Sequence, residues 1–184
     1  DKGREPNFKL TLCHRLDKET SGVLVFAKSK EASDWVMTQF KERKCHKTYH
    51  ALCSGIATKK TWKQKNFLSP LGGKSQKVEV VKCGGKTAIT SFKPLFTHNT
   101  NKISLIEAKP LTGRSHQIRV QLSKSELSIL GDKKYNHKIE KGKTKSFYEH
   151  HLLHAKSLKI KPSEKQDFIT IHASYPDLFT KTLL

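Results

Sequence analysis

Three short polar segments of the sequence hold side chains that could do nucleophilic or acid–base chemistry. The segment HRLDKETSG (residues 14–22) places Asp17 two residues after Arg15, and the segment that begins at Lys47 adds Tyr49. The segment PLTGRSHQIRVQL (residues 110–122) contributes Arg114, His116, Gln117 and Arg119. An aspartate among so many cations should stay ionised, because nearby positive charge lowers a carboxylate pKa, whereas burial alone raises it. Such an aspartate is suited to attack a sugar carbon or to take a proton there. A structural Asp–Arg ion pair under a turn would explain the same residues equally well.

The charge balance of the 184-residue chain indicates a polyanionic partner. Lysine and arginine number 36 against 16 aspartate and glutamate residues, which gives a net charge of +20 and a pI near 9.9. An enzyme of small neutral substrates does not need so much self-repulsion, and a nucleic acid is the natural partner. A ribosome-bound or secreted basic protein, or a solvated lysine surface, is the alternative explanation.

The length and hydropathy of the chain predict one folded domain, which we expect to span residues 1–184. Only 35% of the residues are hydrophobic, but they fall in periodic segments typical of a globular domain with a charged exterior. No apolar run approaches the roughly 18 residues of a membrane span, and the N-terminus lacks an apolar signal region. We therefore expect a cytoplasmic protein without a membrane partner. No apolar surface stripe indicates a dimer, so we expect a monomer.

The cysteines do not form a metal-binding pattern. The sequence holds Cys13, Cys45, Cys53 and Cys83, without a C-x-x-C pair and without the close spacing of a zinc site. We interpret them as reduced thiols that mostly fill the core, and we expect no bound metal.

The elements that must position the polar segments form an α+β domain, with helices flanking a mixed, mostly antiparallel central sheet. Strands are predicted at residues 22–28, 47–55, 76–83, 86–96, 102–110, 152–160 and 167–173. The third to fifth strands should form an antiparallel meander, and the polar residues 58–75 are interpreted as a loop or hairpin arm. Helices should begin at the N-cap Ser29, at the N-cap Thr112 and at Pro176. A basic loop is expected at residues 133–145.

The motifs in these segments resemble those of the RluA family of pseudouridine synthases. HRLDKETSGVLVFAK (residues 14–28) resembles the family's catalytic motif, H-R-L-D followed by T-S-G and a strand that ends in alanine. Three further matches follow in the family's order: KTYHALCSG (47–55), LTGRSHQIRVQL (111–122), and ILGDKKY (129–135) with LLHAKSL (152–158). Together they cover roughly residues 12–158, and four colinear motifs are hard to explain by chance. The resemblance implies the pseudouridine synthase catalytic fold.

The resemblance also implies an enzyme that converts uridine in rRNA or tRNA to pseudouridine without a cofactor. The uracil would be detached from C1′, turned, and rejoined through C5. Asp17 would be the catalytic aspartate that acts at the ribose, and Arg119 the ion-pair partner that keeps it charged and aimed. Tyr49 would stack on the uracil and is the candidate base for the C5 proton. A dry pocket with a fixed anion below the ribose suits this chemistry, because cleavage leaves charge on the uracil while the sugar becomes electron-poor.

The remaining cations would bind the RNA. A uracil inside a stacked helix cannot reach Asp17, so the nucleotide must be flipped out, at a cost of about a few kcal/mol. By the resemblance, Arg15 would occupy the vacated stack, where a planar guanidinium replaces base contacts better than lysine does. Arg114 and His116, near a helix N-terminus, are placed for phosphate contacts, with helix capping as the alternative for Arg114. The other predicted RNA contacts are His14, Lys47 and Gln117. Lysines of the 133–145 loop would add unspecific contacts or form a solvated surface.

The sequence departs from the family pattern in two places. Family members carry strands with a K-P-x-G segment ahead of H-R-L-D, and often an S4-type RNA-binding domain; we find neither and expect an N-terminally truncated catalytic domain. The third motif ends R-V-Q-L instead of R-V-H, a change we expect to be tolerated because Gln121 lies beyond the predicted contacts. A catalytically inactive RNA-binding module of the same fold is the second hypothesis. The joint presence of Asp17, Tyr49 and Arg119 favours the enzyme.

Overall fold

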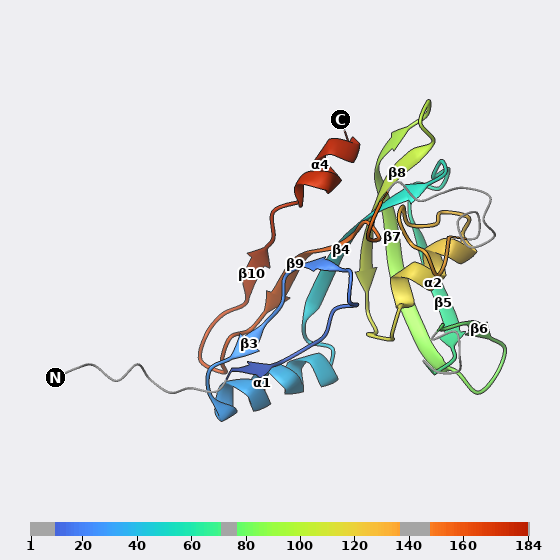
Figure 1. The fold of residues 1–184 in the computed structure, drawn as a ribbon. Coiled ribbons are helices and arrows are strands. Elements are labelled where there is room, and N and C mark those ends of the chain that lie inside the picture. Colours follow the sequence, from blue (N-terminus) through green and yellow to red (C-terminus); the bar gives the residue numbers. More distant parts are fainter. Residues whose placement is uncertain (1–9, 71–76, 137–147, 184) are drawn as a thin grey trace.

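The computed structural model describes residues 10–70, 77–136 and 148–183. Its elements in chain order are β1 (Thr11–Leu12), β2 (Ser21–Gly22), β3 (Phe26–Ala27), α1 (Lys30–Lys41), β4 (His46–Ser54), β5 (Trp62–Leu68), β6 (Val80–Val81), β7 (Lys86–His98), β8 (Ile103–Pro110), α2 (Gln117–Lys124), β9 (Leu153–Ile160), β10 (Ile169–His172) and α4 (Asp177–Leu183). The predicted class is confirmed, because the chain forms a mostly antiparallel sheet with a few helices around it (Figure 1). Most of the predicted basic loop at 133–145 lies outside the described residues.

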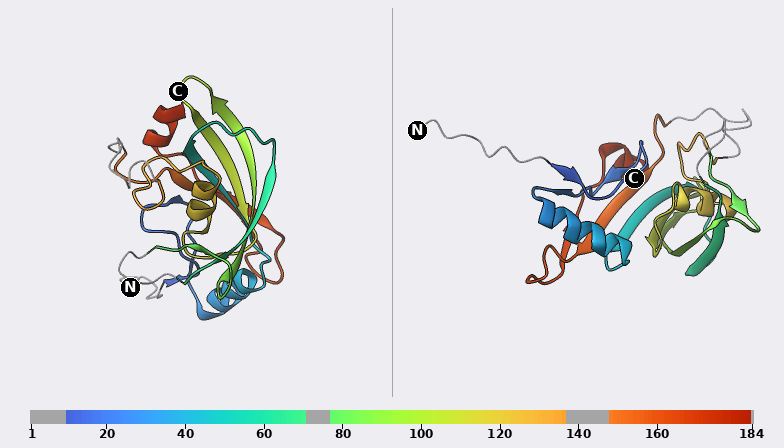
Figure 2. Two further views of the ribbon diagram at one scale, coloured as in Figure 1. Left: turned by 90° about the vertical axis from the view of Figure 1, so that its right-hand side faces the viewer. Right: turned by 90° about the horizontal axis from the view of Figure 1, so that it is seen from below.

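The central sheet has eight strands: seven follow the order β10-β9-β4-β8-β7-β5-β6, and the eighth, β2, pairs in parallel with β9. The other pairings along this path are antiparallel, and β1 and β3 form a separate antiparallel ribbon. The sheet is twisted, with α1 and α2 near different ends of it (Figure 2). The strands β4, β8 and β9 therefore form the middle of the sheet, between the two helices.

Successive side chains of β4 point to opposite faces of the sheet. Ala51 and Cys53 point to one face and pack with Ile118 of α2 in a buried cluster. Leu52, between them, points to the other face and packs with Phe179 of α4. Both faces of this strand are therefore covered, which anchors α2 and α4 on opposite sides of the sheet.

The first helix begins where it was predicted to begin. The Ser29 hydroxyl accepts a hydrogen bond from the backbone nitrogen of Ala32 at 3.2 Å, which satisfies one of the free donors of the first turn. Val36 is buried and packs against Leu158 and Ile160 of β9. Within the described residues, no helix has both the length and the apolar character needed to cross a membrane.

The predicted continuous strand at 22–28 is wrong, because the chain there forms two separate short strands. Ser21–Gly22 pairs with β9, while Phe26–Ala27 turns away to pair with β1. Gly22 has a φ of 117°, and a Cβ there would collide with the backbone of Ala155. Glycine thus lets the segment just after residue 20 lie directly against β9.

The predicted meander is correct only for β7 and β8, which pair along their length. Residues 58–75, predicted as a loop or hairpin arm, contain the strand β5, which lies between β7 and β6. Residue 76 lies outside the described residues, and of 77–83 only Val80–Val81 forms a strand, paired with β5 and not with β7. Because β5 pairs antiparallel with β6, the hairpin-arm alternative is the correct one. The segment lacks apolar alternation because the polar side chains of Gln64 and Asn66 face α2. There Asn66 accepts a hydrogen bond from Gln121, which is fully buried.

The helix expected after the N-cap Thr112 starts four residues later, with His116 as N-cap and Gln117 as its first residue. Thr112 is not the N-cap, because its hydroxyl accepts the backbone N–H of Ile89 at 2.9 Å and donates to Gln117 Oε1 at 2.8 Å. His116 takes the N-cap position with a left-handed backbone, φ 53° and ψ 16°. Residues 111–116 therefore form a loop at the end of β8, held by side-chain hydrogen bonds in place of helical ones.

Candidate active site

One cavity of about 950 Å³ gathers the predicted catalytic and RNA-binding residues. Its walls come from the loop between β1 and β2, from the start of β4, and from the segment that joins β8 to α2. All residues predicted for these roles line it: His14, Arg15, Asp17, Lys47, Tyr49, Arg114, His116, Gln117 and Arg119. The structure thus brings together residues that are far apart in the sequence, while their individual roles stay predictions.

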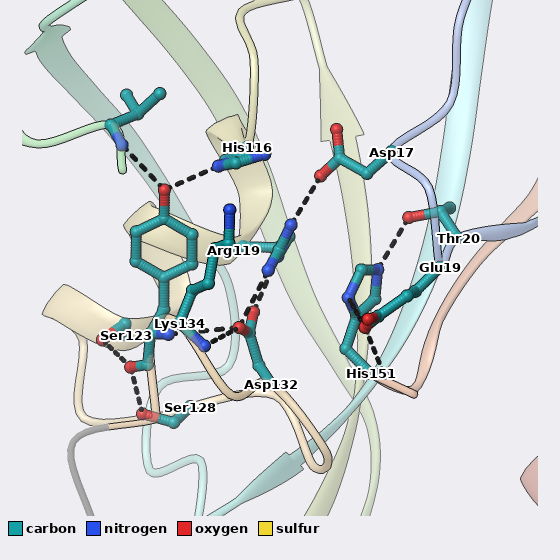
Figure 3. Close-up of polar contacts among 12 residues, drawn as sticks. Asp17, Glu19, Thr20, His116, Arg119, Ser123, Ser128, Asp132, Lys134 and His151 are labelled. Atoms are coloured by element: carbon teal, nitrogen blue, oxygen red, sulfur yellow. Dashed lines mark hydrogen bonds and ion pairs between the residues drawn. The ribbon is translucent and has the colours of Figure 1, made fainter. Parts of the chain in front are cut away.

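Asp17 lies in a turn that is fastened to the start of β9. The backbone nitrogen of Thr20 donates to the Asp17 carbonyl at 2.9 Å, which closes the turn. The Thr20 hydroxyl lies 2.9 Å from Nε2 of His151, a buried side chain. Glu19 reaches the same imidazole from the other side, with 3.1 Å between Oε2 and Nδ1 (Figure 3). These contacts fix the backbone that carries the Asp17 carboxylate.

Arg119 lies between two carboxylates (Figure 3). Its Nη1 donates to Asp17 Oδ2 at 3.2 Å, while Nε and Nη2 donate to Asp132 Oδ2 and Oδ1 at 2.7 and 2.9 Å. The side chain of Asp132 is 1% exposed and that of Arg119 is 7% exposed, whereas that of Asp17 is 25% exposed. Asp132 is thus the bidentate partner of Arg119. Asp17 accepts a single hydrogen bond from Arg119, on the side that faces the cavity.

The sequence alone did not indicate a role for Asp132, which lies in the segment ILGDKKY (129–135). Its Oδ1 also accepts the backbone N–H groups of Lys134 and Tyr135 at 3.0 and 3.1 Å. Burial by itself raises the pKa of Asp132, but the hydrogen bonds and charge of Arg119 outweigh it and leave the pKa below its usual value. Burial lowers the pKa of Arg119, and the two carboxylates more than reverse this. The buried pair is therefore ionised.

Tyr49 lies on β4 and packs against the cluster beneath α2. Burial, and then the negative charge of Asp17, raise the pKa of Tyr49 to about 12. The phenol is therefore protonated at neutral pH. It can present a ring and a hydroxyl to a ligand in the cavity, and it can accept a proton only as it gives up its own.

Lys47 and His14 both line the cavity and lie close enough for the charge of Lys47 to act on the His14 ring. Burial lowers the pKa of Lys47, and a side chain added at Gly113 would come 3.4 Å from its ammonium. Burial and the charge of Lys47 lower the pKa of His14. Nε2 of His14 accepts the backbone N–H of Val25 at 3.2 Å, and its ring lies 4.8 Å from that of Phe40. His14 is therefore a neutral ring built into the wall, with one nitrogen already used.

The side-chain oxygen and nitrogen of Gln117 both form hydrogen bonds within the protein. Its Oε1 accepts from the Thr112 hydroxyl at 2.8 Å and from the Arg114 backbone at 3.0 Å. Its Nε2 donates to the carbonyl of Ile89 at 3.0 Å and to the hydroxyl of Thr90 at 2.8 Å. Contact of Gln117 with RNA stays a prediction; the contacts observed here hold the loop between β8 and α2 in shape.

Arg114 and Arg15, the other two arginines predicted for the site, are placed differently in the cavity wall. Arg114 donates from Nε to the carbonyl of Thr87 at 3.0 Å, which ties the guanidinium to β7 at the cavity wall. This contact does not cap α2, the alternative raised for Arg114. Arg15 is exposed at the rim. Within the described part of the chain, no group of three or more histidine, cysteine, aspartate or glutamate side chains is arranged to hold a metal ion.

Comparison with known proteins gives one consistent family. A family model described as RNA pseudouridylate synthase matches residues 2–124. Ribosomal large subunit pseudouridine synthase C of Rickettsia typhi is 35% identical over 96% of this chain and 56% of its own length. tRNA pseudouridine synthase C of Vibrio parahaemolyticus is 32% identical over 91% of this chain and 74% of its own length. The solved structure of human RNA pseudouridylate synthase domain containing 1 covers 95% of this chain and 72% of its own, with a TM-score of 0.80 and 27% identity. The chain spans little more than half the length of the first of these relatives.

Proposed function

The chain belongs to the RNA pseudouridylate synthase family, and from this premise we propose that it isomerises uridine in RNA to pseudouridine. The observation that carries the proposal is the ion pair of Asp17 with Arg119 beside Tyr49 in one cavity. In the isomerisation the C1′–N1 bond breaks, a C1′–C5 bond forms, C5 loses a proton and N1 gains one. Atoms and charge balance without an oxidant, a reductant or a cofactor.

Asp17 is proposed to act at C1′ of the ribose. The reaction needs an anion there, because the sugar becomes electron-poor as the uracil departs. Asp132 already balances the charge of Arg119, so Arg119 orients Asp17 through one hydrogen bond without cancelling its negative charge. The partly exposed carboxylate of Asp17 faces the cavity, where a ribose can approach it.

Tyr49 is proposed to stack on the uracil and to take part in moving the C5 proton. With a pKa near 12 it cannot act as a standing phenolate at neutral pH. The Tyr49 hydroxyl must therefore release its own proton as it accepts the C5 proton. The negative charge that acts on the phenol is that of Asp17. This pairing of a neutral phenol with a nearby carboxylate supports a shared proton path.

RNA is the proposed substrate, and rRNA or tRNA the proposed class, since the relatives compared above act by name on one or the other. The net charge of +20 fits a polyanion, and the cations of the cavity wall fit its phosphates. Flipping of the target nucleotide, with Arg15 filling the vacated stack, is part of the proposal because the cavity has to admit a single base. The cytoplasmic location, the monomeric state and the absence of a metal remain parts of the same proposal.

The test is to incubate the full-length protein with total RNA from cells that lack it and to map pseudouridine chemically. We expect new pseudouridine at one or a few uridines. RNA that binds with steep salt dependence yet gains no pseudouridine would support the inactive RNA-binding module instead. The expected cytoplasmic location is checked by cell fractionation.

A further inference from the structure

A short hydrogen-bonded chain ends at His116 in the cavity wall. The phenol oxygen of Tyr135 lies 2.8 Å from the backbone nitrogen of Val78 and 2.7 Å from Nδ1 of His116 (Figure 3). Tyr135 is buried and packs with Val78 and Val120, so its ring has little freedom. His116 itself lines the cavity, as does Asp17. The contact therefore joins a fixed core residue to an active-site side chain.

The donors and acceptors in this chain decide where the protons lie. The backbone N–H of Val78 can only donate, so the phenol oxygen accepts from it. The phenol has one hydrogen, and Nδ1 of His116 is its acceptor among the described residues. Burial raises the pKa of Tyr135 to about 12, so the phenol keeps this hydrogen at neutral pH. An Nδ1 that accepts leaves the single proton of a neutral imidazole on Nε2.

The charged groups that face His116 oppose one another. Asp17, from the loop before β2, and Asp132, after α2, favour its protonated form. Arg119, on α2, and Lys134 disfavour it. Burial is the largest influence and lowers the pKa of His116, so the ring is neutral.

The backbone of His116 gives a second, independent indication of function. Its φ of 53° lies in the left-handed region, which residues other than glycine seldom adopt. Such conformations are costly and collect at functional sites, where the surroundings hold them. Here the hydrogen bond to Tyr135 holds the ring at the cavity wall.

We propose that Tyr135 fixes His116 in the neutral tautomer with its proton on Nε2, so that His116 offers RNA an uncharged hydrogen-bond donor beside Asp17. Figure 3 shows the other ring nitrogen of His116 on the side of the ring where Asp17 lies. Tyr135 is then a positioning residue that acts through His116. The expected contact of His116 with a phosphate is replaced by a neutral donation to an oxygen of the target nucleotide. This consequence rests on the proposed function, whereas the tautomer does not.

The tautomer is tested without RNA, by long-range ¹H–¹⁵N NMR of the full chain labelled with ¹⁵N-histidine. The His116 signals are assigned by their loss in His116→Gln. We expect the Nε2–H tautomer at neutral pH, and a mixture of tautomers in Tyr135→Phe. Tyr175→Phe is the matched control, since its hydroxyl lies 2.6 Å from Nδ1 of His50 on the other face of the sheet. It should alter His50 alone. A His116 that carries its proton on Nδ1, or that is doubly protonated at pH 7, would overturn the proposal.

The consequence for RNA is tested by turnover and salt dependence. We expect Tyr135→Phe to lower kcat about tenfold with little change in KM, as a displaced donor should. His116→Ala should lower kcat further, His116→Gln should recover part of it, and neither should change the slope of log affinity against log salt. Loss of a cationic phosphate contact would instead reduce that slope by about 1. A reduced slope in His116→Ala, or unchanged kcat in Tyr135→Phe with the tautomer released, would overturn the role. Failure of the wild type to make pseudouridine at all would instead contradict the proposed function.

Discussion

Asp17 and Arg119 lie 102 residues apart in the chain and meet at 3.2 Å between carboxylate Oδ2 and guanidinium Nη1. Asp132 holds the other two donors of Arg119, Nε and Nη2. Two carboxylates thus share one guanidinium, and of the two Asp17 is the more exposed and lines the cavity. An arginine bound only to Asp17 would neutralise it. The arrangement therefore orients an anion while leaving its charge for the proposed reaction.

Replacing Asp132 by asparagine should destabilise the fold. The buried guanidinium of Arg119 then keeps only its single hydrogen bond to Asp17, and breaking a buried ion pair by removing one partner costs about 3–5 kcal/mol. Denaturant unfolding measures the loss. Asp34→Asn is the matched control, because the exposed pair of Lys30 with Asp34 should contribute nothing measurable. Equal stability of the two variants would contradict the assigned importance of the buried pair.

The same carboxylate should shape the stability of the wild type in acid. The pKa of Asp132 is lowered in the folded state, so its contribution is fully present above the unfolded value of about 3.9. It is lost as the pH falls from there through the lowered folded value. We expect unfolding free energy to decline below about pH 4 and to decline less steeply in Asp132→Asn. Parallel pH profiles of the two proteins would show that Asp132 is not held ionised by Arg119.

The turn that carries Asp17 should depend on the hydroxyl of Thr20. Thr20→Val keeps the shape but removes the contact with His151, and a small displacement of Asp17 should lower kcat about tenfold or more. RNA affinity should hold, and Thr20→Ser should restore turnover. Thr182→Val, which removes an exposed hydroxyl on α4, is the control. A change in KM alone would mean that Thr20 contributes to binding and not to the position of Asp17.

Tyr49→Phe separates stacking from proton transfer. The ring remains for contact with the uracil, so RNA affinity should change less than about threefold, while turnover should fall by about 10² or more if the hydroxyl moves the C5 proton. Single-turnover assays and filter binding measure the two effects. Full turnover by Tyr49→Phe would remove the hydroxyl from the mechanism.

Arg114→Gln should weaken binding to RNAs of any sequence. Loss of one phosphate contact should reduce the slope of log affinity against log salt by about 1. Lys165→Gln, an exposed lysine remote from the cavity residues, is the control and should leave the slope unchanged. Identical slopes in the two variants would assign Arg114 to the framework through its bond to Thr87.

The sequence predicts much of this arrangement because its motifs and periods are local. The alternation of β4 places Tyr49 on the face of α2, and the helix cap at Ser29 needs only neighbouring residues. Contacts between segments that are distant in the sequence could not be predicted in this way. Asp132 forms two hydrogen bonds with Arg119 only because the loop after α2 folds back and brings this carboxylate to the helix. The late start of α2 likewise depends on Thr112, whose hydroxyl bonds to β7 instead of capping the helix.

The central claim is that the carboxylate of Asp17 does the chemistry and is not only half of a structural ion pair. The most direct test is Asp17→Asn assayed for pseudouridine formation under single-turnover conditions, with RNA binding and thermal stability measured on the same preparation. Asparagine keeps the size and can still accept a hydrogen bond from Arg119, so we expect a folded protein that binds RNA and forms no detectable pseudouridine. Formation of pseudouridine at the wild-type rate would contradict the account.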